Sequence, residues 1–273
     1  MKTDLILLTN DDGAHARGLL SLREALQPLG KVVVVAPSEE QSGVGHGLTI
    51  RKPLRVTELA KDLYSLTGTP VDCVIFAVRK LLGEAPGLVI SGINHGANLG
   101  DDVHYSGTVA AAREAAFYGI PSIAASLVCQ SSSPSFQWAS LLVRELVGEL
   151  YPDRIPEGTY LNVNIPEGKP VNYRFTRQGS RRVTTTITES SGKRGRKHYW
   201  IDQDRSEWVI EADTDYFAIR EGAVSVTPMH RDHTDYRSLI FFSQEDEREE
   251  SSGRGAEPQS EEKRNEEQSK ARN

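Results

Sequence analysis

The chain has little cysteine, no long hydrophobic run and no excess of positive charge. Cys73 and Cys129 are the two cysteines in 273 residues, and their spacing excludes a disulfide-stapled secreted scaffold and fits a reducing compartment. No apolar stretch approaches a membrane span, and the first is too short for a signal peptide. A net charge of -6 offers no basic surface for nucleic acid. We expect a cytoplasmic protein without a membrane or nucleic-acid partner.

What is present is an alternation of short hydrophobic runs with helical patterns through the first half of the chain. It predicts an α/β fold with a Rossmann-like, three-layer catalytic core in residues 1–150, in which helices cover both faces of a mostly parallel sheet. The strands are expected at residues 5–9, 31–36, 88–91 and 122–126, and helices are expected around the leucines at 19, 22, 26 and 29 and at residues 71–82, 108–118 and 136–150.

After Leu150 the pattern changes to strands and turns. We expect residues 151–243 to form a smaller β-rich part that completes the core, with one or two hairpins built from 173–176, 182–189 and 197–201. The threonine-rich strand is either a projecting arm that pairs with another subunit or a plain surface hairpin. Residues 244–273 are charged and almost without apolar side chains, which predicts a disordered tail.

Two adjacent aspartates, Asp11 and Asp12, follow the first buried strand directly. Open α/β sheets bind ligands just beyond the carboxyl ends of their strands. Neighbouring carboxylates repel each other unless a cation or a shared proton relieves the repulsion, so the pair indicates a Mg²⁺ or Mn²⁺ site. The alternative is ordinary turn or helix-capping chemistry.

Three further segments rich in glycine and small polar residues are expected at the same sheet edge. The loop after the second strand contains Ser42 and is too long and glycine-rich for a simple connector. A later loop contains Asn94 and Asn98, which can offer carbonyls to a cation or amide donors to an anion. Ser106, Gly107 and Thr108 open an alanine-rich helix, and free backbone amides at a helix start suit a phosphate group.

These segments together resemble the SurE family, the survival-protein family of 5'/3'-nucleotidases. The resemblance covers roughly residues 4–230 and rests on Thr9–Gly13, Ala36–His46, Gly68–Cys73, Ser91–Asn98, Ser106–Val109, Phe175–Gln178 and Glu221–Pro228. It implies one divalent metal ion per subunit, held by Asp11, Asp12, Ser42 and Asn94. It also implies hydrolysis of nucleoside monophosphates, with some members acting on other phosphate esters, and assembly into homodimers or homotetramers.

The predicted mechanism gives Asp11 and Asp12 the catalytic role of holding the ion, while Asn98 and residues 106–108 bind the phosphate. Four histidines at 15, 46, 95 and 104 lie in or beside these loops. Their spacing does not match a zinc site, but His46 or His104 could act as general acid toward the leaving ribose oxygen. For each of the four histidines, the alternative is a structural role in which the side chain packs in a polar loop.

Three other classes of protein share the expected scaffold. A receiver-like signalling domain also holds Mg²⁺ at an acidic pair, but its phospho-accepting aspartate and its lysine are missing here. A dinucleotide-binding oxidoreductase would need a Gly-x-Gly-x-x-Gly fingerprint, which does not follow the first strand. A non-catalytic nucleotide-binding module remains as the alternative to an enzyme.

Overall fold

The computed structural model describes residues 5–129, 131, 134–151, 154–168, 170, 172–191 and 197–253. Contacts divide the chain into two compact units, Met1–Arg231 and Asp232–Asn273. Strands from residues 151–231 belong to the same large sheet as strands from residues 1–150. The change of pattern after Leu150 is therefore a change of connectivity within one compact unit.

The first unit is built on a nine-stranded sheet with the order β3-β4-β2-β1-β5-β6-β7-β11-β8. From β4 to β7 in this order the strands are parallel, while β3 runs antiparallel to β4 and β11 runs antiparallel to β7. The bounds are β1 (Leu5–Thr9), β2 (Lys31–Pro37), β3 (Val56–Ala60), β4 (Leu63–Leu66), β5 (Leu88–His95), β6 (Ser122–Val128), β7 (Thr159–Pro166), β8 (Tyr173–Phe175) and β11 (Val224–His230).

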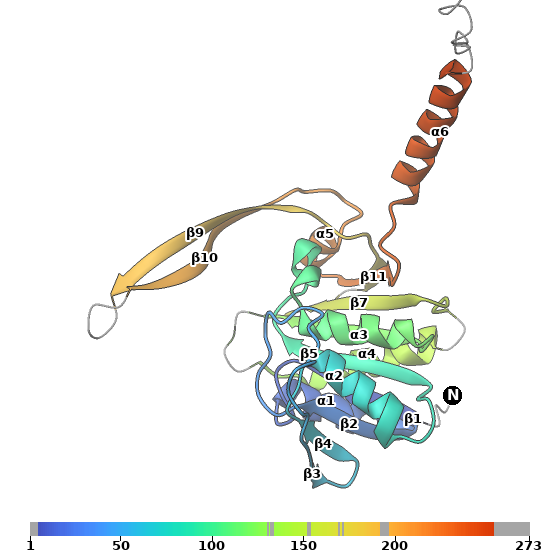
Figure 1. The fold of residues 1–273 in the computed structure, drawn as a ribbon. Helices are drawn as coiled ribbons and strands as arrows, with labels where there is room; N and C mark the ends of the chain where they lie inside the picture. Colours follow the sequence, from blue (N-terminus) through green and yellow to red (C-terminus); the bar gives the residue numbers. More distant parts are fainter. Residues whose placement is uncertain are drawn as a thin grey trace, which may run out of the picture. The chain divides into compact units, whose positions relative to one another are not determined.

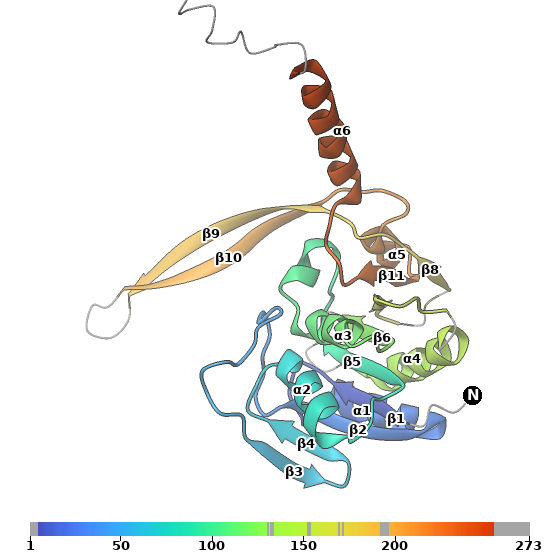
Figure 2. The ribbon, with the colours of Figure 1, turned by 45° about the vertical axis from the view of Figure 1, so that its right-hand side comes forward.

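Helices cover both faces of this sheet, which confirms the three-layer prediction (Figures 1 and 2). Strand β1 shows why its sequence is hydrophobic throughout. Ile6 and Leu8 pack in the core cluster that contains α1 (Arg17–Leu26) and α4 (Gln137–Leu150). Leu5 and Leu7 pack in the opposite cluster, with α2 (Pro70–Phe76) and α3 (Gly107–Phe117). Side chains alternate between the two faces of a strand, so a strand covered on both sides needs apolar residues at every position.

The helix expected at residues 71–82 has two parts. Thr69 caps α2 by accepting a hydrogen bond from the Asp72 N–H, and the Asp72 side chain accepts one from the Thr69 N–H, a reciprocal capping box. The helix continues past Phe76 as the π-helical segment η2 (Ala77–Leu81). The sequence therefore placed the helix correctly, while hydrophobic spacing could not distinguish the wider winding of its second half.

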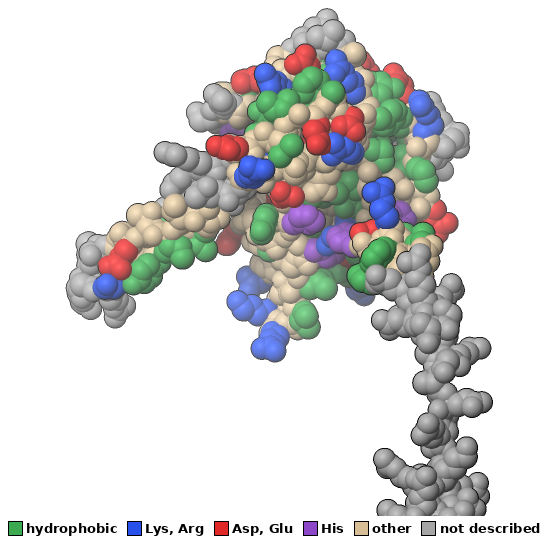
Figure 3. Space-filling model, turned by 90° about the horizontal axis from the view of Figure 1, so that it is seen from above, with side chains coloured by type: hydrophobic (Ala, Val, Ile, Leu, Met, Phe, Trp, Pro, Cys, Tyr) green, Lys and Arg blue, Asp and Glu red, His purple; other side chains and the backbone are tan. Residues whose placement is uncertain are grey.

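One long hairpin projects from the first unit, formed by β9 (Arg181–Ser191) and β10 (Lys197–Trp208) (Figure 1). It includes the stretches predicted at 182–189 and 197–201. The stretch predicted at 173–176 instead forms β8, which pairs in parallel with β11 at the edge of the large sheet. Hydrophobic side chains lie along the arm in Figure 3, and Ile187 and Ile201 are 69% and 77% exposed.

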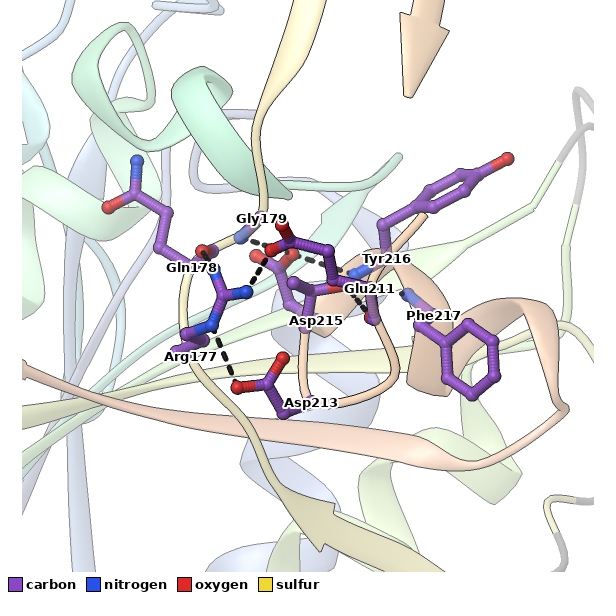
Figure 4. A network of polar contacts seen from close by, with 9 residues as sticks. Arg177, Gln178, Gly179, Glu211, Asp213, Asp215, Tyr216 and Phe217 are labelled. Carbon is purple, nitrogen blue, oxygen red and sulfur yellow. Dashed lines mark hydrogen bonds and ion pairs between the residues drawn. The ribbon is translucent and has the colours of Figure 1, made fainter. Parts of the chain in front are cut away.

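A network of polar contacts fixes the base of this hairpin (Figure 4). The buried Asp215 carboxylate accepts hydrogen bonds from the backbone N–H groups of Gly179, at 2.9 Å, and Gly100, at 2.8 Å. Arg177 donates to Asp213 at 2.8 Å beside it. Asp215 begins α5 (Asp215–Arg220), and Gly100 begins η3 (Gly100–His104), which directly precedes α3. The hairpin base is thereby joined to the segment that leads into the predicted phosphate site.

The second unit contains α6 (Tyr236–Gly253). The sequence predicted disorder from Gln244 onward, but residues 244–253 are helical in the structure. Residues 254–273 lie outside the described residues. The composition argument considered only the missing apolar core, whereas glutamate, glutamine and arginine have high intrinsic helix propensity. Among the helices that the structure describes, none is long and apolar enough to span a bilayer.

Candidate active site

The predicted site segments meet at one edge of the sheet, where β2, β1 and β5 end side by side. Thr9, the last residue of β1, is in register with Ser91 of β5, so the residues that follow β1 emerge beside the last residues of β5. The Gln41 N–H donates to the Asp11 carbonyl at 2.8 Å, which joins the loop after β2 to the loop after β1. The His95 N–H approaches the Asp12 carboxylate at 3.3 Å from the end of β5.

Asp11 is buried against the first turn of α3. Its carboxylate accepts hydrogen bonds from the Thr108 N–H, at 3.0 Å, and from the Thr108 hydroxyl. A Cβ on Gly107 would lie only 2.9 Å from the Asp11 Cβ, so the helix reaches this aspartate because residue 107 is a glycine. Burial raises the pKa of Asp11, and the Thr108 hydrogen bonds partly offset that rise. The start of the helix, with its positive dipole end, favours the ionised carboxylate in the same way.

These contacts change the role predicted for Thr108. The sequence placed its donors on a phosphate group, whereas the structure directs both of them to Asp11. Ser106 is the N-cap residue of α3 and accepts a hydrogen bond from the Val109 N–H at 3.1 Å, which leaves its hydroxyl hydrogen for another acceptor. Thr108 therefore orients a carboxylate, and Ser106 is the better placed anion donor of the two.

Asp12 is held close to Asp11 in a partly buried position. Burial, and then the negative charge of Asp11, raise the pKa of Asp12 to about 6. Two carboxylates in such surroundings resist being ionised together, and a divalent cation relieves both the repulsion and the cost of burial. The electrostatics of the pair thus fit a metal site better than a simple turn.

Ser42 and Asn94 supply neutral oxygen atoms. Ser42 is exposed, and its hydroxyl donates to Glu40 at 2.9 Å within its own turn. Asn94 donates its amide N–H to the Gly96 carbonyl at 3.0 Å, so its Oδ1 keeps lone pairs for a ligand. In the described part of the chain, no three His, Cys, Asp or Glu side chains gather to hold a metal. Carboxylate, hydroxyl and amide oxygens are hard donors of the kind that Mg²⁺ and Mn²⁺ prefer.

A small cavity of about 180 Å³ lies beside Asp12. It is bounded by the loop after β1, the first turn of α1 and the end of β5, so a group of modest size could sit there in contact with the acidic pair. The lining residues are Asp12, Ala16, Arg17, Gly18, His95, Pro134 and Phe136.

Two asparagines that the sequence reasoning missed hold Asn98 in place. Asn162 and Asn164 of β7 donate to the Asn98 carbonyl at 2.8 and 3.0 Å, and Asn164 also accepts the Asn98 N–H at 2.8 Å. The Asn98 side chain donates to Ser126 at 2.7 Å. The sequence signal for these two residues was asparagine at every second position of an otherwise apolar run. One face of a buried strand rarely carries two amides unless they have hydrogen-bond partners.

The four histidines near these loops have separate surroundings. The His46 ring contacts Glu114 at 2.8 Å, whereas His95 Nε2 lies 2.9 Å from the Ser131 carbonyl. His15 is exposed in the loop after β1, and His104 lies in η3. The partners of His46 and His95 therefore lie on different elements.

Comparisons with known proteins fit this architecture. Residues 6–185 match the family model described as survival protein SurE. The chain is 46% identical over 237 residues to the 5'-nucleotidase SurE of Pelobacter propionicus, covering 86% of this chain and 96% of that one. It is 44% identical over 243 residues to the enzyme of the same name from Geobacter sulfurreducens, covering 87% and 92%.

A solved structure extends the match to three dimensions. The crystal structure of the SurE protein from Aquifex aeolicus superimposes with a TM-score of 0.78 at 42% identity, over 89% of this chain and 99% of that one. The fold and the sequence thus agree, and the chain belongs to the SurE family.

Proposed function

We propose that this protein is a divalent-metal-dependent phosphomonoesterase that hydrolyses nucleoside 5'- and 3'-monophosphates to nucleoside and phosphate. The observation that carries the proposal is the acidic pair at the sheet edge, a buried Asp11 beside a partly buried Asp12, where hydroxyl and amide ligands also emerge. Its relatives at about 45% identity are named 5'-nucleotidases, which supports the substrate class. Other phosphate esters and polyphosphate are further candidate substrates.

Asp11, Asp12, Ser42 and Asn94 would hold one Mg²⁺ or Mn²⁺ per subunit. A divalent ion supplies Lewis acidity, which draws electron density from a phosphoryl oxygen and promotes ionisation of the attacking water. The chain's own task is to keep the ligands in place before substrate arrives. Thr108 does so for Asp11 by donating two hydrogen bonds from the first turn of α3.

The phosphate itself would be bound by donors next to the acidic pair. Ser106 has a hydroxyl hydrogen available at the start of α3, and Asn98 is held in position by β7. Such donors stabilise charge that develops in the transition state, and removing one typically costs about 10²- to 10³-fold in rate. His104, in the turn directly before Ser106, is the candidate proton donor to the leaving oxygen.

The projecting hairpin supports assembly of more than one subunit. Its two strands pair only with each other along the described part of the arm, and large side chains such as Tyr199 and Trp200 are 60% and 62% exposed. A two-stranded ribbon buries too little apolar area to account for those side chains. We infer that a second copy of the chain covers them, in a homodimer or homotetramer.

The test is a phosphate-release panel on the purified protein. Nucleoside 5'- and 3'-monophosphates and a simple phosphate ester are incubated with Mg²⁺, Mn²⁺, Zn²⁺ or a chelator. We expect release from the nucleotides with Mg²⁺ or Mn²⁺ and none with chelator. Absence of release with every metal would refute the enzyme assignment, and release that persists in chelator would refute the metal dependence.

A further inference from the structure

Backbone hydrogen bonds hold the loop that carries Ser42 on either side of the serine, at Gln41 and at Gly45, but the loop is rich in glycine. We call residues 38–47 the serine loop. Gly43 and Gly45 adopt positive φ angles of 76° and 56°, and a Cβ on Gly43 would meet nothing within 4 Å. The Ser42 hydroxyl bonds only within its own turn, to Glu40. Glycine-rich backbone loses much entropy on ordering. Each side-chain contact that already holds the loop therefore reduces the entropy that is lost when a metal binds through Ser42.

His46, near the end of the serine loop, makes such a contact with α3. Its Nε2 lies 2.8 Å from the Glu114 carboxylate, and the Arg113 Nε–H donates to its Nδ1 at 3.1 Å. The His46 and Glu114 side chains are 19% and 11% exposed, so water competes weakly for the pair. The ring of Phe117, one helical turn further on, packs edge-on against the imidazole, with 5.7 Å between the two ring centroids.

The two contacts fix which nitrogen of His46 carries the proton. Arginine is a donor only, so Nδ1 must accept from Arg113 and has no hydrogen of its own. The single hydrogen of the neutral ring is then on Nε2, where it is donated to Glu114. In this arrangement His46 has no N–H left for a leaving oxygen, which argues against the general-acid role considered for it.

The same helix also holds the other side of the site. Thr108 in the first turn of α3 fixes Asp11, and Glu114 lies roughly two turns later. A contact between His46 and Glu114 therefore sets the serine loop and Asp11 against one rigid element. The Gly45 N–H adds a backbone hydrogen bond to Tyr105, at 2.9 Å, in the segment that leads into α3.

We propose that His46 is a positioning residue, and that the Arg113–His46–Glu114 contact latches the serine loop to α3 and so places Ser42 for metal binding. The proposal rests on the proposed function for its consequence, whereas the latch itself can be tested without metal. Glutamine can donate a hydrogen bond but cannot exchange a proton near neutral pH. If His46 is a structural latch, glutamine should replace it; if His46 is a general acid, glutamine should not.

The test compares His46→Gln, His46→Ala and a control, Lys52→Ala, at an exposed position beyond the loop. Glutamine places an N–H where it can still donate to Glu114, while alanine cannot. Three quantities are measured: hydrogen exchange of residues 41–47 without metal, the dissociation constant for Mn²⁺ by calorimetry, and kcat at saturating Mn²⁺. Circular dichroism establishes that each variant is folded.

We expect His46→Ala to speed exchange in residues 41–47 and to raise the Mn²⁺ dissociation constant about tenfold, the order expected for losing a hydrogen bond to a charged partner. The value of kcat at saturating Mn²⁺ should stay within about twofold of wild type, because ordering is then complete. His46→Gln should restore slow exchange and tight binding, and Lys52→Ala should match wild type throughout.

Two results would overturn the latch. One is wild-type exchange and Mn²⁺ affinity in His46→Ala. The other is a His46→Gln protein that binds Mn²⁺ normally yet has lost turnover at saturating metal, which would restore the general acid. If the wild-type protein bound no Mn²⁺ and released no phosphate, the proposed function would fail instead, and the exchange comparison would still decide whether the loop is latched.

Discussion

Single residues at the sheet edge determine whether the acidic pair can exist. Asp11 tolerates burial because Thr108 donates two hydrogen bonds to it, and Asp12 tolerates its neighbour with a pKa raised to about 6. Repulsion between two neighbouring carboxylates lowers the stability of the folded protein, and a bound cation offsets that loss of stability. This trade-off means that neutralising one carboxylate of the pair should raise stability and lower activity.

Asp12→Asn should raise the melting temperature of the metal-free protein at pH 7.5. A carboxyl whose folded pKa is raised contributes stability at low pH, and that contribution is lost as the pH rises through about 6. Asparagine does not ionise, so the variant avoids the loss. Calorimetry of both proteins in chelator at pH 5 and pH 7.5 measures the difference. An advantage of equal size at the two pH values would contradict the ionisation argument.

Gly107→Ala tests the close approach of α3 to Asp11. The new Cβ would lie 2.9 Å from the Asp11 Cβ and 3.1 Å from Pro70, so we expect a loss of about 1–3 kcal/mol in the free energy of unfolding. Phosphate release should fall as well, since Asp11 must move.

Gly148→Ala is the matched control for that substitution. Gly148 is exposed within α4, and a Cβ there meets nothing within 4 Å, so alanine should stabilise the protein by about 0.5–1 kcal/mol. Urea denaturation of both variants gives the comparison. Equal effects of the two substitutions would contradict the steric explanation.

At the scale of elements, the sequence predicted the strands that consist of short hydrophobic runs. Strands β1, β2, β5 and β6 were predicted because continuous apolar runs bounded by polar turns are typical of parallel strands. Strand β3 was missed because all of its residues are exposed, so it carries no burial signal. Strand β7 was missed because asparagines interrupt its apolar pattern, and those asparagines turned out to support Asn98.

The site was predictable as a meeting of loops but not as a set of contacts. Topology brings the ends of β1, β2 and β5 to one edge, and this needs only the order of the strands. The partners of Thr108 and His46 depend on how far α3 extends over that edge, which residue types alone do not determine. Thr108 was therefore expected on phosphate and His46 among the candidate acids, whereas they hold Asp11 and Glu114.

At the scale of the whole molecule, the hairpin arm predicts self-association. Ile201 on β10 is 77% exposed, and an aspartate there would place a charge in the proposed interface. We expect light scattering to give at least the mass of a dimer for the wild-type protein and a smaller mass for Ile201→Asp. Ile50→Asp, at a site that is 85% exposed and belongs to neither strand of the arm, should leave the mass unchanged. A monomeric wild-type protein would contradict the inferred role of the arm.

The acidic pair is the centre of the proposed chemistry, and one comparison tests it directly. Phosphate release from a nucleoside 5'-monophosphate in Mn²⁺ is measured for the wild-type protein and for Asp12→Asn, both shown to be folded. We predict metal-dependent release by the wild type and a loss of at least about a hundredfold in the variant. Release by Asp12→Asn at the wild-type rate would show that Asp11 and Asp12 do not form the catalytic metal centre.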